Sequence, residues 1–226
     1  MITTISFIKY SSNKFWAFKQ MNESHKYFSN NKNITFYKLL GTGAGNGFLL
    51  PDLSTYAVLV VWNSKKNADD FLKNSAHSLI VEKKAHSRTD FYLKTIQTHG
   101  LWDNQNPFKS NIVDYDKDDK IAIITRGKIK LSKQIDFWLN VPKASNAIKV
   151  AEGVEFYKGI GELPLMAQAT FSIWKNINAV KNFAYKSKAH SDIIKKTKQR
   201  NWYSEDMFTR FIITCLLYTS DAADDT

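Results

Sequence analysis

Apolar residues recur along the chain at two spacings, and their alternation predicts a fold that mixes strands and helices. Segments in which every second residue is apolar are typical of half-buried strands, and segments with apolar residues three and four apart are typical of helices. In the first part of the chain, the strand pattern covers 4–10, 34–41, 54–62 and 90–98. Helical spacing covers 65–74 and 76–84, and 13–21 is predicted as a helix or a loop.

The same order of patterns returns further along the chain. The strand pattern covers 120–130, 154–162, 168–174 and 206–214, and the helical pattern covers 134–148 and 178–186. Each part therefore reads as a βαββαβ unit, which forms an antiparallel four-stranded sheet with helices on one face. The predicted fold class is α+β.

Individual residues repeat together with the elements. Phe15-Trp16 matches Phe137-Trp138, and AHSLIVEKK at 76–84 matches AHSDIIKKT at 189–197. The repeat is too long for a solenoid. We therefore predict an internal duplication, in which two ferredoxin-like halves pack their sheets face to face as a fused dimeric α+β barrel. The halves are residues 1–110 and 119–214, and the polar segment between them is the expected linker.

The last twelve residues, CLLYTSDAADDT, differ in composition from the Lys-rich chain before them. Their back-translation closely resembles a transposon-end sequencing adapter, so we expect residues 215–226 to be a library artefact and exclude them from reasoning about the fold. This segment contains the single cysteine, Cys215. A disulfide framework, a catalytic thiolate and a Cys-ligated metal site are then excluded.

The formal net charge of +11 does not by itself indicate nucleic-acid binding. Lysine supplies most of the positive charge, and arginine stands only at positions 88, 126, 200 and 210. This bias is typical of an AT-rich genome, and clusters of arginine that read bases are missing. We expect no nucleic-acid partner.

Hydropathy gives no sign of a membrane span. The longest apolar run, YAVLVVW at 56–62, is much shorter than the roughly 20 residues that a spanning helix needs. The N-terminus lacks the basic start and apolar core of a secretory signal. We expect a cytoplasmic protein, with peripheral contact to the inner membrane as an open possibility.

Few motifs in the chain carry recognisable chemistry. The four alternating glycines from Gly41 to Gly47 do not have the spacing of a dinucleotide fingerprint. His77 and His190 each share a predicted helix face with apolar residues, which suits either a satisfied semi-buried histidine or a haem ligand. No zinc-hydrolase or catalytic-triad signature is present.

Several segments resemble the spheroidene monooxygenase family of carotenoid ketolases. They are FYKLLGTGAGNGF, LWDNQNPF, ITRGKIK, FWLNVP, YKGIGELPLMAQATFSIW and FAYKSKAHSDIIKKTKQRNWYSEDMFTRF, in order from Phe36 to Phe211. The resemblance implies an enzyme that oxidises a terminal carbon of an acyclic, spheroidene-like carotenoid to a ketone. It also implies O2 as a substrate, a ferredoxin-type electron donor and a haem cofactor.

Site residues follow from the resemblance position by position. The family's histidine falls on His190, which is the expected axial ligand of the haem iron, whereas His77 has no counterpart and is expected to be structural. Arg126 and Arg210 are expected to bind the cofactor through its propionates, and Trp174 is expected to lie against the porphyrin or the polyene. Further matched positions are Glu162, Gln168, Trp202 and Glu205. No catalytic residue is assigned.

Two other function classes stay open from the sequence. One is a cofactor-free oxygenase of the same barrel superfamily, and the other is a non-catalytic protein that binds an apolar ligand. A shared fold does not discriminate among the three.

Overall fold

The structure is a computed structural model of the 226-residue chain. It describes every residue except 46–49, 110–113, 164–166, 187–194, 198 and 221–226, and within one helix it leaves the side chains of 141–147 undescribed.

The first half of the chain contains four strands and four helices. In chain order they are β1 (Ile2–Lys9), α1 (Lys14–Glu23), α2 (His25–Phe28), β2 (Ile34–Gly43), β3 (Pro51–Trp62), α3 (Lys65–Asn74), α4 (Ala76–Lys84) and β4 (Ser87–Gly100). Helices α3 and α4 begin at serine caps, because the side chains of Ser64 and Ser75 accept hydrogen bonds from the N–H groups of Asn67 and Ser78.

The second half follows the same sequence of elements. They are β5 (Ile121–Ile129), the short 3-10 helix η1 (Leu131–Lys133), α5 (Gln134–Lys149), β6 (Val154–Leu163), β7 (Ala167–Trp174), α6 (Ile177–Lys186) and β8 (Tyr203–Ser220). None of the described helices is both long and apolar enough to cross a membrane.

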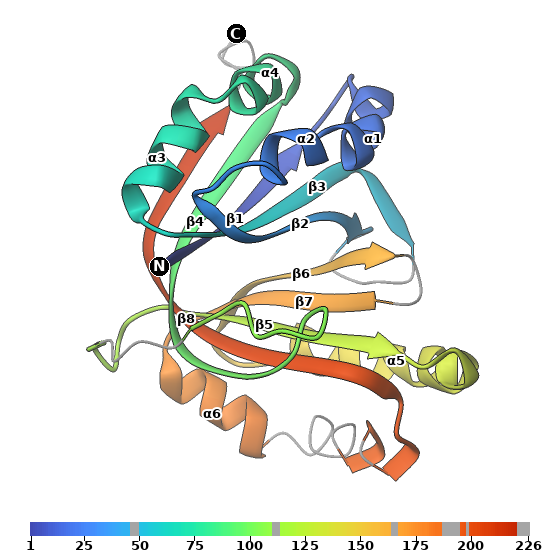
Figure 1. Cartoon of the computed structure of the whole chain (residues 1–226). Coiled ribbons are helices and arrows are strands. Elements are labelled where there is room, and N and C mark those ends of the chain that lie inside the picture. Colours follow the sequence, from blue (N-terminus) through green and yellow to red (C-terminus); the bar gives the residue numbers. More distant parts are fainter. Residues whose placement is uncertain (46–49, 110–113, 164–166, 187–194, 198, 221–226) are drawn as a thin grey trace, which may run out of the picture.

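All eight strands join one closed antiparallel barrel, in the order β1-β3-β2-β6-β7-β5-β8-β4 (Figure 1). The predicted α+β class is therefore confirmed. Helices lie outside the barrel wall. The two seams between the halves differ greatly in length, because β4 pairs with β8 from Ser87 to Gly100, whereas β2 pairs with β6 only at Gly41 and Thr42.

The β2/β3 ladder of the first half and the β6/β7 ladder of the second half begin in the same register. Trp62 pairs with Ile34 at the end of the β2/β3 ladder, and Trp174 pairs with Val154 at the end of the β6/β7 ladder. A β-bulge follows at the same place in both ladders, between Ile34 and Phe36 and between Val154 and Phe156. Trp62 and Trp174 thus lie at equivalent positions of two like sheets.

The barrel wall separates an inner apolar core from outer ones. Inward-pointing aromatic residues such as Phe7, Phe91 and Phe171 fill the barrel. On the outside, Trp62 packs under α3 and Trp174 packs under α6, where its ring centroid lies 4.9 Å from that of Phe183. Burial of these two faces is the main favourable contribution to folding.

β8 continues through the segment that we expect to be adapter-encoded. Residues Cys215 to Ser220 pair with the beginning of β4, and the side chains of Leu216 and Tyr218 are exposed. The origin of residues 215–226 stays a prediction.

Helix α4 carries the first copy of the repeated histidine phrase. His77 is buried among the rings of Tyr27, Phe28 and Phe71, with centroid distances of 4.9 to 6.0 Å. This environment is that of a structural histidine. The second copy, with His190, lies outside the described residues.

We predict that His77 makes the protein less stable in acid. Burial, and secondarily the charge of Arg88, lower the pKa of His77 from 6.5 to about 4. As the pH falls from about 6.5 to about 4, the unfolded chain binds a proton that the folded protein does not, so stability falls by up to roughly 3 kcal/mol. His77→Phe should remove this part of the pH dependence, as measured by urea unfolding at pH 7.5 and pH 4.5. An identical loss in the variant and the parent would contradict the prediction.

Candidate functional site

A tight turn after β4 covers the barrel where β2 and β6 separate. Asp103 and Asn104 both have positive φ, at 55° and 61°, and Trp102 pairs with Gln105 across them. Two successive left-handed residues are typical of a type I′ turn, which Asp and Asn tolerate well. Gly100 allows the approach to the turn, since a Cβ there would stand 2.2 Å from the carbonyl oxygen of Asp206.

Arg126 is a buried cation that faces the interior of the barrel. It lies on β5 on the same face as Ala122 and Ile124, and only 2% of its side chain is exposed. Its Nη1 pairs with Glu205, its Nη2 lies 3.6 Å from Glu162, and its guanidinium lies 5.1 Å from the centre of the Trp102 ring. Such a charge is tolerated inside a protein only when it is paired.

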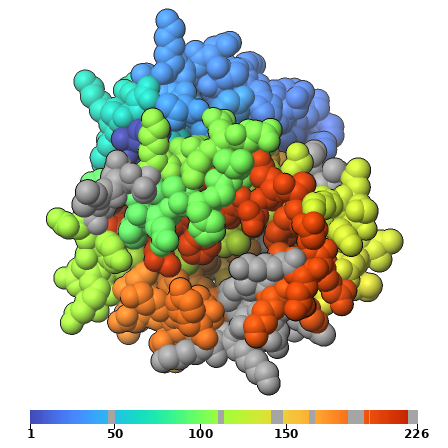
Figure 2. All heavy atoms as spheres, turned by 60° about the horizontal axis from the view of Figure 1, so that its bottom comes forward, coloured from blue at the N-terminus to red at the C-terminus, as the bar shows by residue number. Residues whose placement is uncertain are grey.

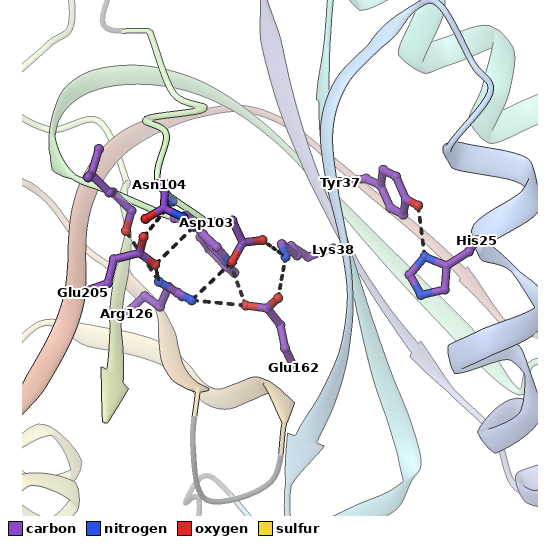
Figure 3. A network of polar contacts seen from close by, with 10 residues as sticks. His25, Tyr37, Lys38, Asp103, Asn104, Arg126, Glu162 and Glu205 are labelled. Carbon is purple, nitrogen blue, oxygen red and sulfur yellow. Dashed lines mark hydrogen bonds and ion pairs between the residues drawn. The ribbon is translucent and has the colours of Figure 1, made fainter. Parts of the chain in front are cut away.

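Lys38 enters the same network from the opposite side of the opening. Its ammonium group pairs with Asp103 and Glu162, and Glu162 also accepts a 2.7 Å hydrogen bond from the indole of Trp102. Figure 3 shows that the two cations converge on these carboxylates from β2 and β5. The network thus ties β2, the turn, β5 and β6 together.

The third carboxylate belongs to Glu205, which holds the turn. It accepts hydrogen bonds from the main-chain N–H groups of Asp103, at 3.1 Å, and Asn104, at 2.7 Å (Figure 3). Burial alone would raise the pKa of Glu205, but these donors and Arg126 lower it. Burial would likewise lower the pKa of Lys38, but its two carboxylate partners raise it. Glu205 and Lys38 therefore keep their charges at neutral pH.

A pocket of about 610 Å³ opens beside this network. Lys38, Asp103 and Glu162 form part of its wall. Its other lining residues include Phe28 and Phe36, and the hydroxyl of Tyr37 lies 3.0 Å from Nδ1 of His25. The lining of the pocket is thus mixed, with aromatic and aliphatic side chains beside a fixed ionic wall.

The network is the place where distant segments of the sequence meet. Its members come from FYKLL (Lys38), LWDN (Trp102 and Asp103), ITRG (Arg126), GIGE (Glu162) and WYSE (Glu205). Each of these short stretches lies within a segment on which the family resemblance rests. We therefore take the network and its pocket, the candidate site, as the best-defined polar site among the described residues.

The structure separates the residues that the sequence nominated for cofactor binding. Arg126 points into the barrel, whereas Trp174 and Arg210 lie on the outer face of the second-half sheet. Trp174 packs under α6, and Arg210 extends over the ring of Phe208, which belongs to the same cluster. His190 follows α6 in the chain and lies outside the described residues.

The two arginines also differ in the hydrogen-bonding capacity that they have left. Arg126 already faces Glu205, Glu162 and Asp103, so a propionate would be a fourth negative group beside it. Arg210 donates one 3.1 Å hydrogen bond to Gln97 and has no carboxylate partner among the described residues, although the buried Nε is without a partner in both arginines. Arg210 therefore fits an anionic cofactor group better than Arg126 does.

Sequence reasoning did not single out Lys38, Trp102 or Asp103. A signal for Lys38 was present, because Phe36, Lys38 and Leu40 alternate onto one face of a strand and a cation there interrupts an apolar row. Trp102 and Asp103 lie in a turn, where periodicity gives no information. Among the described residues, no group of three or more His, Cys, Asp and Glu side chains has an arrangement that holds a metal ion.

Comparison with known proteins gives three relatives that carry one name. Spheroidene monooxygenase of Rhodobacter capsulatus is 30% identical over 200 residues, which are 87% of this chain and 82% of that protein. The chain belongs to the spheroidene monooxygenase family. Spheroidene monooxygenase of Cereibacter sphaeroides is 28% identical over 214 residues, covering 93% of this chain and 66% of that protein. Membership confirms the resemblance, and it makes the chain an oxidoreductase.

A protein of known structure that has a different name shares the fold of this spheroidene monooxygenase family member. Aldoxime dehydratase superimposes with a TM-score of 0.64 at 11% identity, over 97% of this chain and 84% of that one. At this identity the likeness concerns the fold alone. No family model matches the chain.

We predict that Arg126 is a major contributor to the stability of the family member. Arg126→Met would leave the surrounding carboxylates without their buried cation, and should lower the free energy of unfolding by about 3–5 kcal/mol. The matched control is Arg200→Met, which removes an ion pair with Asp136 that is 48% exposed on the arginine side, and should cost less than about 1 kcal/mol. Denaturant unfolding measures both, and equal losses would show that the network does not stabilise the barrel.

Proposed function

We propose that the protein is a carotenoid monooxygenase that oxidises a terminal carbon of an acyclic, spheroidene-like carotenoid to a ketone. The observation that carries the proposal is the family relationship, which extends over most of the chain. Apolar side chains in the pocket wall, such as Phe28 and Phe36, support it, because a hydrocarbon needs an apolar contact surface.

The reaction requires O2 and an electron donor. In each insertion one oxygen atom enters a C–H bond, and the other is reduced to water with two electrons and two protons. A second insertion at the same carbon, followed by loss of water, gives the ketone. We propose a ferredoxin-type protein as the donor, because the basic surface of the chain suits an acidic electron carrier.

We propose haem as the cofactor, with His190 as the ligand of its iron. When bound, haem would supply the activation of O2, and the protein would orient the substrate and exclude water. Trp174 and Arg210 would flank the cofactor from the outer face of the second-half sheet. Arg210 has no carboxylate partner among the described residues, which supports this assignment, while Arg126 would serve to order the candidate site.

We also propose that the two halves arose by duplication of one ferredoxin-like unit, which makes the barrel a fused counterpart of a dimer. The identical register and bulge position of the β2/β3 and β6/β7 ladders support this origin.

Absorption spectroscopy and product analysis test the function. Protein produced with haem supply should show a Soret band that His190→Ala abolishes and that His77→Phe, at the buried histidine of the first half, retains. With O2, reduced ferredoxin and a carotenoid dispersed in detergent, the parent should form a ketone detectable by mass spectrometry. Activity in colourless, metal-free protein would favour a cofactor-free oxygenase, and ligand binding without turnover would favour a non-catalytic protein.

A further inference from the structure

Helix α5 presents an apolar stripe to solvent. The stripe consists of Ile135 and Leu139 in α5, which are 80% and 74% exposed, and of Leu131, four residues before Ile135 in η1, which is 72% exposed; Val150, just after the helix, is 82% exposed. A spacing of four residues places side chains on one helix face. Isolated exposed leucines are common at protein surfaces, but such a row on one face indicates a contact surface.

The opposite face of α5 accounts for the attachment of the helix to the protein. Phe137 packs against Trp202 and Tyr203, with ring centroids 5.6 and 5.8 Å apart. Asp136 accepts a 2.7 Å hydrogen bond from the indole of Trp202 and pairs with Arg200. The helix is therefore held in place by the face that carries Phe137 and Asp136. The residues of the stripe take no part in this packing.

Positive charge surrounds the stripe. Lys130 and Lys133 stand at its beginning and Lys149 at its end. The pair with Asp136 brings Arg200 against the same helix, and Figure 2 shows orange-red chain from the later part of the sequence beside the yellow-green α5. Arg200 balances the charge of Asp136. Glu152, which is exposed and lies beyond the end of α5, is an acidic neighbour of the stripe.

We propose that the stripe of α5 docks on an anionic lipid bilayer. A helix with an aliphatic face and flanking lysines is typical of proteins that lie in the membrane interface, where the apolar side chains enter the acyl boundary and the lysines contact lipid phosphates. Aliphatic side chains that are about three-quarters exposed match such insertion. A second copy of the chain fits the stripe less well, because its own lysines would oppose those of the first.

This inference deepens the proposed function and rests on it for its purpose, because a carotenoid is a hydrocarbon that dissolves in lipid. Docking through α5 would hold the second half at the bilayer surface. Arg200, which pairs with Asp136 of this helix, would then lie close to the lipid.

Co-sedimentation with vesicles free of carotenoid tests the surface directly. The parent should bind phosphatidylcholine vesicles that contain phosphatidylglycerol and should bind pure phosphatidylcholine much more weakly. Leu131→Ser/Ile135→Ser/Leu139→Ser should lower the partition coefficient at least tenfold, because it removes the inserted apolar area. High salt should weaken binding, since it screens the lysines. The matched control is Leu79→Ser/Ile80→Ser, at exposed aliphatic residues of α4, which should bind like the parent.

Three outcomes would overturn the proposal. The triple variant could bind vesicles as tightly as the parent, or the parent could fail to bind anionic vesicles. The triple variant could also lose only self-association, measured by size exclusion, or only binding to an acidic ferredoxin, in which case the stripe is a protein interface. Circular dichroism and urea unfolding establish that the variants are folded.

The same variant separates docking from catalysis. With carotenoid dispersed in detergent, the triple variant should keep the activity of the parent, because none of its changes lies in the candidate site or among the proposed haem contacts. Vesicle binding without any ketone formation would contradict the proposed function and leave docking intact, and the reverse result would contradict docking alone.

Discussion

Closure of the barrel is the constraint on which the rest of this structure depends. Each half forms a sheet with an apolar inner face, and that face is removed from water only when the two sheets meet. The meeting is unequal, because β4 and β8 pair along a long seam, whereas β2 and β6 pair only at Gly41 and Thr42. An opening therefore exists on one side, and side chains must fill it.

The ionic network is the physical solution to that opening. Backbone groups cannot bridge strands that diverge, but Lys38 and Glu162 reach each other from β2 and β6, and Arg126 lies behind them. Burying Arg126 would be costly if it were alone, and three carboxylates and the Trp102 ring compensate for that cost. The same groups form one wall of the pocket, so the closure of the barrel and the shape of the candidate site have one origin.

The wall of the barrel also divides the possible chemistry between two environments. Its inner side is an aromatic core that ends at the fixed charges, and its outer side contains Trp174, under α6, and Arg210, which bonds Gln97 and has no carboxylate partner among the described residues. A cofactor held by Trp174 and Arg210, as proposed, would belong to the outer environment. Helix α5 adjoins the second half from another direction, with its apolar stripe toward solvent, so the proposed membrane contact and the proposed cofactor site need not compete for residues.

The sequence by itself determined the elements and their order. Periodicity of two or of about three and a half residues reports which side of an element is buried, and that information is local. This local information was enough to predict the strands from β1 to β8, the helices from α3 to α6, and the likeness of the two halves. The resemblance in segments such as GIGELPL and WYSEDMFTRF was enough to predict the family.

Only the tertiary structure decided which residues act together. Alternation places Arg126 and Trp174 on faces of their strands, but it does not say which face is inside the barrel, since both faces are apolar where helices cover the outside. The partners of Arg126 come from a turn and from two other strands, at separations of up to 79 residues. Contacts of that kind depend on how strands close around a core, and a local pattern does not encode them.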